Sequence, residues 1–313
     1  MGAWLAWGLL VPTTPNGQKF VMLRSGLTTR KIAAELKSAG VIRSEKAFLL
    51  WHYFHRRSSL KAGEYLFEKP ATVVTVHHRL VRGDIYTHTV VIPEGYNMFD
   101  VAQTIEKAGL GSKEDFLKVA RSDTDLIHDL APEATSLEGY LFPDTYELTR
   151  TQSMRDIATV MVHHFRQVAG SLGLSNDVHR TVTMASIVEK ETAAPEERPL
   201  VASVYYNRLT RRMALDADPS VIYAELLANT YQGALHHEDL QTKSPYNTYR
   251  CPGLPPGPIA NPGRSALDAA MHPAVSDYLY FVSNGNGHHR FALSLEEHNR
   301  NVNAFRRTVQ HRP

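Results

Sequence analysis

The sequence lacks most of the features that mark the common classes of enzyme and binding protein. Its 313 residues contain one cysteine, Cys251, so no disulfide can form within the chain. It has no phosphate-binding Walker loop, no glycine-rich dinucleotide fingerprint and no G-x-S-x-G serine motif. The histidine pairs at 236–237 and 288–289 lack the H-E-x-x-H spacing of a zinc site. We therefore predict no cofactor and no metal, and keep a metal-dependent amidase only as an alternative.

The chain also lacks an excess of charge of either sign. The formal net charge is +2, and lysine and arginine are spread along the chain. A nucleic-acid-binding protein usually gathers basic residues on one face, so we predict no nucleic-acid partner. Hydrophobic residues make up 43% of the chain, which is ordinary for a globular protein, and the length is sufficient for two domains.

No hydrophobic run is long enough to span a membrane. The apolar stretch Ala3–Val11 has nine residues, about half of what a bilayer core requires, and no basic segment precedes it as in a signal peptide. Two interpretations stay open: a short arm that packs on the fold, or the outer end of an N-terminal membrane anchor. Trp4 and Trp7 would suit the interface of a membrane.

Two stretches in the N-terminal part repeat each other. Leu23–Ile42 and Ile92–Gly111 align without a gap at an offset of 69 residues, with glycines and apolar residues at matching positions. This pattern predicts a duplicated strand–turn–helix unit, similar to the LysM-like modules that bind glycan strands. A purely structural role for the two copies is the alternative.

Apolar periodicity gives the remaining organisation, which is α+β. We divide the chain into an apolar arm or anchor remnant (1–15), a duplicated LysM-like region (16–122), a connecting segment (123–150) and a mixed α+β domain (151–313). In the connecting segment, the aromatic residues of 137–148 either stack on sugars or fill an interface. Helices are predicted at 27–39, 44–54, 72–81, 152–172 and 195–213, and strands at 64–67, 278–282 and 290–293.

The most informative chemistry is a pair of acids after a helical apolar pattern. Glu189 and Glu191 are rotated to nearly opposite sides of a helix, so they cannot act as a pair. Glu191 continues the apolar face of Ile187 and Val188, whereas Glu189 follows a shallower, more polar stripe. Burial and the negative end of the helix both favour a protonated Glu191, which predicts a general acid. The alternative is two surface glutamates at a frayed helix end.

Six blocks of sequence, in order and with similar spacing, resemble the endolytic murein transglycosylase family (MltG, YceG-like). The resemblance covers roughly residues 18 to 305. The blocks are ASIVEKET (185–192), VASVYYNRL (201–209), DPSVIY (218–223), SPYNTY (244–249), GLPPGPIANPG (253–263) and YLYFVSNGNG (278–287).

The resemblance implies a bacterial enzyme held in the inner (cytoplasmic) membrane by one N-terminal helix, which is largely missing here. Its body would lie on the outer, periplasmic face and work beside peptidoglycan synthases (penicillin-binding proteins). Such enzymes cut nascent glycan strands between N-acetylmuramic acid and N-acetylglucosamine, leave 1,6-anhydromuramyl ends and are thought to set strand length. Residues 151–313 would form the catalytic domain. A non-catalytic glycan-binding scaffold is the alternative function.

The family's catalytic glutamate is the second acid of the E-K-E block, which corresponds to Glu191. The mechanism needs one carboxyl group, which first protonates the glycosidic oxygen and then takes the proton of the muramic C6 hydroxyl as it attacks C1. We name Asp218, Tyr246 and Asn247 as candidates for contacting the substrate. His289 is the fourth, because it matches the family's Gly-His-x-Phe segment better than its neighbour does.

Overall fold

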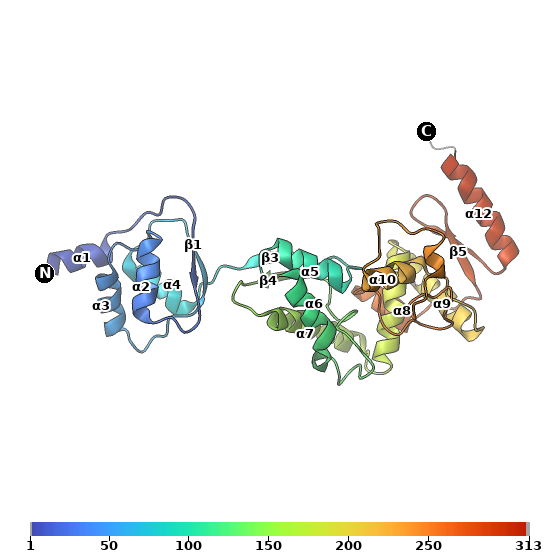
Figure 1. Ribbon diagram of the computed structural model, residues 1–313, viewed down its shortest axis with the longest axis horizontal. Coiled ribbons are helices and arrows are strands. Elements are labelled where there is room, and N and C mark those ends of the chain that lie inside the picture. Colours follow the sequence, from blue (N-terminus) through green and yellow to red (C-terminus); the bar gives the residue numbers. More distant parts are fainter. Residues whose placement is uncertain (1, 311–313) are drawn as a thin grey trace. The chain divides into compact units, whose positions relative to one another are not determined.

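The computed structural model describes residues 2–310, which form a mixed α+β protein (Figure 1). Within this range there are twelve α-helices and three separate two-stranded sheets. The chain divides into two compact units. The first comprises the residues up to Val90 with Ala108–Leu110 and Tyr146–Ser153, and the second comprises Val91–Lys107, Gly111–Thr145 and the residues from Met154 onward. The sequence-based division at residues 15, 122 and 150 stays a prediction.

The first unit is built on one antiparallel strand pair, β1 (Lys19–Leu23) and β2 (Gly63–Phe67), whose register runs from Lys19 opposite Phe67 to Leu23 opposite Gly63. The other elements of this unit are helices: α1 (Gly2–Leu10), α2 (Thr29–Ser38), α3 (Glu45–Phe54) and α4 (Val73–Arg82). Thr28, Ser44 and Thr72 cap α2, α3 and α4 by accepting a backbone N–H with their hydroxyls. These caps explain why the helix starts were predictable.

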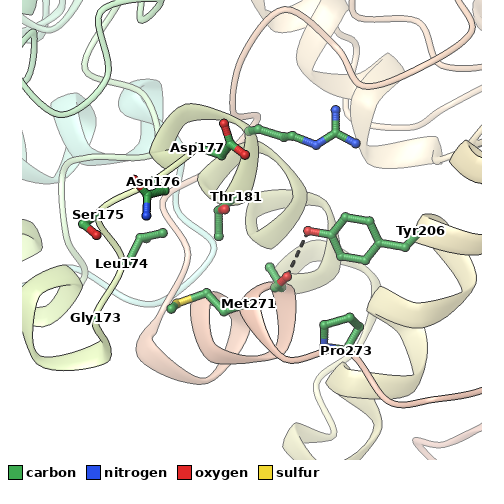
Figure 2. A pocket seen from close by; sticks show the side chains of 11 residues that line it. Gly173, Leu174, Ser175, Asn176, Asp177, Thr181, Tyr206, Met271 and Pro273 are labelled. Carbon is green, nitrogen blue, oxygen red and sulfur yellow. Dashed lines mark hydrogen bonds between the residues drawn. The ribbon is translucent and has the colours of Figure 1, made fainter.

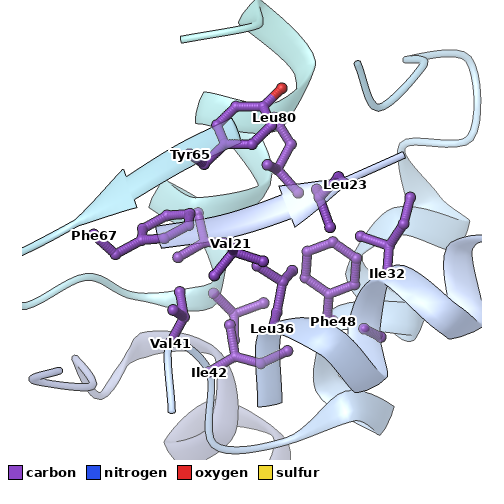
Figure 3. Packing of buried hydrophobic residues seen from close by; sticks show 13 residues of the cluster. Val21, Leu23, Ile32, Leu36, Val41, Ile42, Phe48, Tyr65, Phe67 and Leu80 are labelled. Atoms are coloured by element: carbon purple, nitrogen blue, oxygen red, sulfur yellow. The ribbon is translucent and has the colours of Figure 1, made fainter. Parts of the chain in front are cut away.

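Figure 3 shows the core of this unit, where the inward faces of the strands meet the helices. Val21 and Leu23 alternate with outward residues along β1, as a half-buried strand requires. The buried side chains that meet them are Ile32, Leu36, Phe48, Tyr65, Phe67 and Leu80. This packing gives the first unit a hydrophobic core of its own.

Helix α1 packs against α3 and α4. Gly8 lies close to the α3 backbone, because a Cβ placed there would be 3.2 Å from Cβ of Ala47. Trp7 is half exposed, and the Arg43 guanidinium lies 5.1 Å from the centre of its ring; the side chain of Trp4 lies outside the described part of the structure. Among residues 2–310, no helix combines the length and apolar character needed to cross a bilayer.

The two aligned stretches share an order of elements and similar φ values at two pairs of glycines. The order strand–helix–helix–strand occurs first as β1, α2, α3, β2 and again as β3 (His88–Val91), α5 (Met98–Lys107), α6 (Lys113–Ser122) and β4 (Thr145–Leu148). The aligned glycines Gly26 and Gly95 have φ of 81° and 76°, and Gly40 and Gly109 have φ of 71° and 68°. Left-handed values of this kind favour glycine at each position. The likeness of these units to LysM modules stays a prediction.

The second unit is arranged around α8 (Val178–Glu191), which packs against α9 (Arg198–Thr210), α10 (Asp218–Ala228) and α11 (Arg264–Met271). Every α8 residue from Val182 to Val188 is buried. The remaining regular elements of this unit are α7 (Met154–Leu172), the antiparallel pair β5 (Tyr280–Ser283) and β6 (His289–Ala292), and α12 (Leu295–Gln310), which packs against both strands.

The predicted single helix over 195–213 is in fact two elements. Residues Pro195–Glu197 form a 3₁₀ turn, and α9 begins at Arg198. Each proline lies in the first turn of its own element, Pro195 at the start of the 3₁₀ turn and Pro199 at the start of α9, where a missing backbone N–H is tolerated.

The aromatic residues of the connecting segment are internal. Tyr140, Phe142 and Tyr146 are all buried, so they contribute to packing and do not form an exposed platform for sugars. Glu138, in the same segment of the sequence, is also buried and accepts the N–H of Met98 with both carboxylate oxygens, at 3.1 and 2.9 Å. Asn261 Nδ2 donates to the same carboxylate at 3.1 Å. Glu138 thus joins the start of α5 to the proline-rich loop at 244–263.

Candidate active site

Glu191 is the last residue of α8, and its side chain turns toward α9. Oη of Tyr205, on α9, donates a hydrogen bond of 2.8 Å to Oε1 of Glu191. Tyr205 is completely buried, and a buried phenol needs a hydrogen-bond partner. No other hydrogen bond of the Glu191 carboxyl group occurs within residues 2–310, so Oε2 remains available to a ligand.

Burial raises the pKa of Glu191 from its ordinary value to about 7. The negative charge of Asp218 acts in the same direction, while the Tyr205 hydrogen bond and the Arg208 charge favour the ionised form. A carboxyl group with a pKa near neutrality can both give and take a proton at neutral pH, as a general acid and base must.

Glu191 opens into a pocket of about 360 Å³. Aromatic rings form much of its wall, and charged groups lie among them. The rings belong to Tyr205, Tyr249, Tyr280 and Phe281, the charged groups to Arg208, Asp216 and Asp218, and α12 adds Leu295 and His298. Rings beside hydrogen-bonding groups are suited to the mixed apolar and polar faces of a sugar.

Arg208 holds two walls of this pocket together. Its Nη1 donates to the carbonyl oxygens of Ala214 and Leu215, both at 3.0 Å, and to Oδ2 of Asp216 at 2.9 Å. Its Nε donates to the Leu279 carbonyl at 2.8 Å, and the guanidinium lies 5.2 Å from the centre of the Tyr280 ring. The loop before α10 and the start of β5 are therefore fixed by one side chain.

Two of the predicted substrate-contacting residues, Asp218 and Asn247, form hydrogen bonds with Tyr249. Asp218 lines the pocket together with Glu191, and its Oδ1 accepts a hydrogen bond of 2.5 Å from Tyr249 Oη. Asn247 is completely buried, and its amide donates to the carbonyls of Leu240 and Thr242 at 3.0 and 2.8 Å. Its Oδ1 accepts the N–H of Tyr249 at 3.0 Å. Asn247 therefore orients a residue of the pocket wall.

The other two predicted residues do not line the pocket. Tyr246 packs against Tyr223, with ring centres 5.1 Å apart. His289 Nδ1 lies 2.7 Å from Oε2 of Glu197, and its ring meets the edge of Phe281, a pocket residue, at 5.4 Å. The substrate contacts of Asp218, Asn247, Tyr246 and His289 stay predictions.

Several residues of the site were not singled out from the sequence. The apolar stripe of the predicted helix at 195–213 places the Tyr205 ring in the core, as its burial confirms, but it gives no role to its hydroxyl. A tyrosine in an otherwise aliphatic stripe was the available signal, because its hydroxyl must find a partner inside. Arg208, Tyr280 and His298 reach the site only through tertiary packing.

Comparison with known proteins identifies the family. A family model described as the YceG-like family matches residues 21–304. The chain belongs to this family. It is 34% identical, over 93% of its length, to an endolytic murein transglycosylase of Bacillus subtilis, of which it covers 86%.

A second relative is an endolytic murein transglycosylase of Streptococcus pneumoniae, 31% identical over 94% of this chain; the match spans 60% of that longer protein. A crystal structure of a YceG-like protein from Listeria monocytogenes is 33% identical and superimposes with a TM-score of 0.59, covering 90% of this chain and 98% of that one. The family resemblance of the sequence is thus confirmed.

The first acid of the YceG-like E-K-E block has a different environment. Oε1 of Glu189 is 2.6 Å from Nη2 of Arg198, and its Oε2 accepts the N–H of Gly263 at 2.9 Å. The side chains of Glu189 and Arg198 are only 5% and 6% exposed. The prediction that Glu189 follows a shallow stripe is therefore wrong, because Val182, Ala185 and Ser186 are all buried. The two acids differ in their partners and not in depth.

Glu191 also borders a second pocket, of about 510 Å³. Lys190, Thr192 and Glu94 line it, together with the Glu189–Arg198 pair. The YceG-like acid is therefore a wall common to two pockets. Within residues 2–310, no cluster of three histidine, cysteine, aspartate or glutamate side chains is arranged to share a metal ion.

Proposed function

We propose that this protein is an endolytic murein transglycosylase, a lyase that cleaves the glycan strands of peptidoglycan. The observation that carries the proposal is the half-buried Glu191 carboxyl group, with a pKa of about 7, in a pocket walled by aromatic rings. Membership of the YceG-like family and the names of its relatives support the same reaction class.

In the proposed reaction, protonated Glu191 gives its proton to the glycosidic oxygen between N-acetylmuramic acid and N-acetylglucosamine. The bond breaks through an oxocarbenium-like state, and the carboxylate then takes the proton of the muramic C6 hydroxyl, which attacks C1 of the same sugar. The proton returns to Glu191, a 1,6-anhydromuramyl end forms, and no water is consumed. Attack within one sugar has a high effective molarity, so a second activating carboxylate is not needed.

The protein's other groups support these steps. The Tyr205 hydrogen bond fixes Oε1 of Glu191 and leaves Oε2 to face the glycosidic oxygen. Asp218, held by Tyr249, supplies negative charge that stabilises the developing oxocarbenium ion. The second pocket gives the strand room on both sides of the acid, as cleavage within a strand requires.

The cellular setting follows from the family resemblance. We propose an N-terminal membrane anchor, a catalytic body on the periplasmic face of the inner membrane, and peptidoglycan synthases as partners. The β–α–α–β units would act as LysM-like modules that bind the nascent strand, and cleavage would end its elongation.

The test is digestion of uncrosslinked glycan strands by the wild type and by Glu191→Gln, Glu189→Gln and Glu196→Gln, with products read by mass spectrometry. Glu196 is the matched surface control, since its side chain is 65% exposed. We expect anhydromuramyl ends from the wild type and from Glu196→Gln, and a loss of at least about a hundredfold in Glu191→Gln.

Other outcomes would point elsewhere. Full activity of Glu191→Gln would refute its role as the acid. Reducing ends in place of anhydro ends would mean hydrolysis, with Asp218 as the candidate second carboxylate. Binding of strands without any cleavage by the wild type would favour the scaffold function.

A further inference from the structure

A third pocket, of about 450 Å³, is shown in Figure 2. It lies at the opposite end of α8 from Glu191. Its lining comes from the loop before α8, the first turns of α8, Tyr206 on α9 and the end of α11 with Pro273. Thr181 is ten residues before Glu191, which is about 15 Å along the helix axis. The pocket is therefore separate from the catalytic one.

Five polar side chains that line this pocket, from the loop before α8 and from its first turn, are uncommitted in the described part of the chain. Within residues 2–310, no hydrogen bond or ion pair is made by the side chains of Ser175, Asn176, Asp177, Arg180 and Thr181, all of which line it. Other arginines of this unit differ from Arg180 in this respect: Arg166, Arg198 and Arg208 each bind a carboxylate. The pocket thus gathers uncommitted donors and acceptors in one place.

One side of the pocket is a ring platform. Figure 2 shows the Tyr206 ring opposite Thr181, with Met271 and Pro273 beside it. Oη of Tyr206 donates to the Ala270 carbonyl at 2.9 Å, which holds the ring in place at the wall of the pocket. A fixed aromatic face suits the C–H face of a sugar ring.

The charges of the pocket narrow the class of ligand. Asp177 and Arg180 bring one charge of each sign, so neither a phosphate nor a free cation is favoured over a neutral polar molecule. Carboxylate, guanidinium and amide groups together can pair with hydroxyl and acetamido groups in both donor and acceptor roles.

From this lining we infer that the pocket is a distal saccharide site, which binds an N-acetylated sugar of the glycan strand away from the scissile bond. The inference rests on the proposed function for the identity of the glycan. Because α8 packs against α9 and α11, the distance from this site to Glu191 is fixed by the core. A strand that occupies both would be cut at a preferred distance from the held sugar.

The test uses Glu191→Gln protein, in which we expect turnover of substrate to be suppressed, labelled with ¹³C at the methionine methyl groups. N-acetylchitotetraose is titrated in, and the Met271 signal, assigned with Met271→Leu, reports the pocket. We expect a saturable shift of that signal. Arg180→Gln and Asn176→Ala, both at exposed positions, should each weaken the binding about tenfold, as loss of a charge-assisted or neutral hydrogen bond predicts.

Arg211→Gln is the matched control, because Arg211 is exposed and does not line the pocket. A Met271 signal that never moves, or equal binding in Arg180→Gln and Arg211→Gln, would overturn the distal site. A second readout is the length distribution of fragments made by the active enzyme, which Arg180→Gln should broaden and Arg211→Gln should not.

The two proposals can fail separately. A saturable Met271 shift in a protein whose wild type never makes anhydromuramyl ends would keep the saccharide site and reject the transglycosylase. Anhydromuramyl ends formed by a protein in which Met271 does not respond would do the reverse.

Discussion

Replacing Tyr205 by phenylalanine removes the hydrogen bond that Oε1 of Glu191 accepts at 2.8 Å. That bond stabilises the carboxylate, so its loss raises the pKa of Glu191 above about 7. A hydrogen bond to a charged group contributes about 1.5–3 kcal/mol, and one pKa unit corresponds to about 1.4 kcal/mol. The expected shift is therefore upward by about one to two pKa units.

Replacing Asp218 by asparagine should act in the opposite direction. The Asp218 charge raises the pKa of Glu191, so the neutral amide should let it fall. Asp218 is exposed, and solvent weakens its field, so this shift should be the smaller of the two. The two substitutions thus make opposite predictions about one group.

The assay is the initial rate at which anhydromuramyl ends form from uncrosslinked strands, measured from about pH 5 to about pH 9. In kcat/KM this profile reports ionisations of the free enzyme. Since the protonated form of Glu191 is the proposed acid, activity should fall as the pH rises through its pKa. Tyr205→Phe should move that alkaline limb to higher pH, and Asp218→Asn should move it to lower pH.

Tyr231→Phe serves as the control, because Tyr231 does not line the pocket. Movement of the limb in the same direction for both active-site variants would refute the reasoning. So would a limb that stays in place in both while product still forms, because another group would then set it.

Three further predictions concern the buried Glu138, the ion pair of Glu189 with Arg198, and the need for a metal ion. Burial raises the pKa of Glu138 to about 8, against the hydrogen bonds from Met98 and Tyr223. At pH values above 4.5, the ordinary pKa of the group, Glu138 of the unfolded chain loses its proton while Glu138 of the native state keeps it. The free energy of unfolding should therefore fall as the pH rises from 4.5 to about 8, by roughly 4–5 kcal/mol in all. Glu138→Gln should flatten this fall in urea titrations, and an equally steep fall would exclude Glu138 as its source. Glu189→Gln leaves the buried Arg198 with only the longer, 3.5 Å contact to Glu94, and should cost about 3 kcal/mol in thermal unfolding, whereas Glu191→Gln should cost nothing. Equal melting temperatures would contradict the ion-pair role of Glu189. The enzymatic activity should persist in excess EDTA. A loss of activity under this treatment would favour the alternative of a metal-dependent amidase.

Local signals in the sequence account for much of the fold. Helix α4 was predicted within one residue at each end, because Thr72 caps its start and Gly83, with φ of 78°, closes it. Helix α10 was not predicted, since its apolar residues are not confined to one face and it carries no side-chain cap. Its helical state depends on the surrounding core, which a local pattern does not encode.

The site was predictable only at its centre. Burial at the end of a helix pointed to Glu191, and the structure places it there with a raised pKa. The choice against Glu189 rested partly on a polar stripe that is in fact buried, and what separates the acids is the Arg198 ion pair. Tyr249, Tyr280 and His298 come from segments remote in sequence, and only packing brings them to Glu191.

The position of α12 has a consequence for how the chain is handled. Leu295 and His298 lie in the wall of the pocket into which Glu191 opens, and His298 stacks on Tyr280 at 5.2 Å. The last helix is thus a working part of the cleft and not a dispensable tail. A protease that removes it would open the pocket to water while sparing the acid itself, so an inactive preparation can carry every residue of the E-K-E block. Fusion tags and trimming are therefore safer elsewhere than near residue 295.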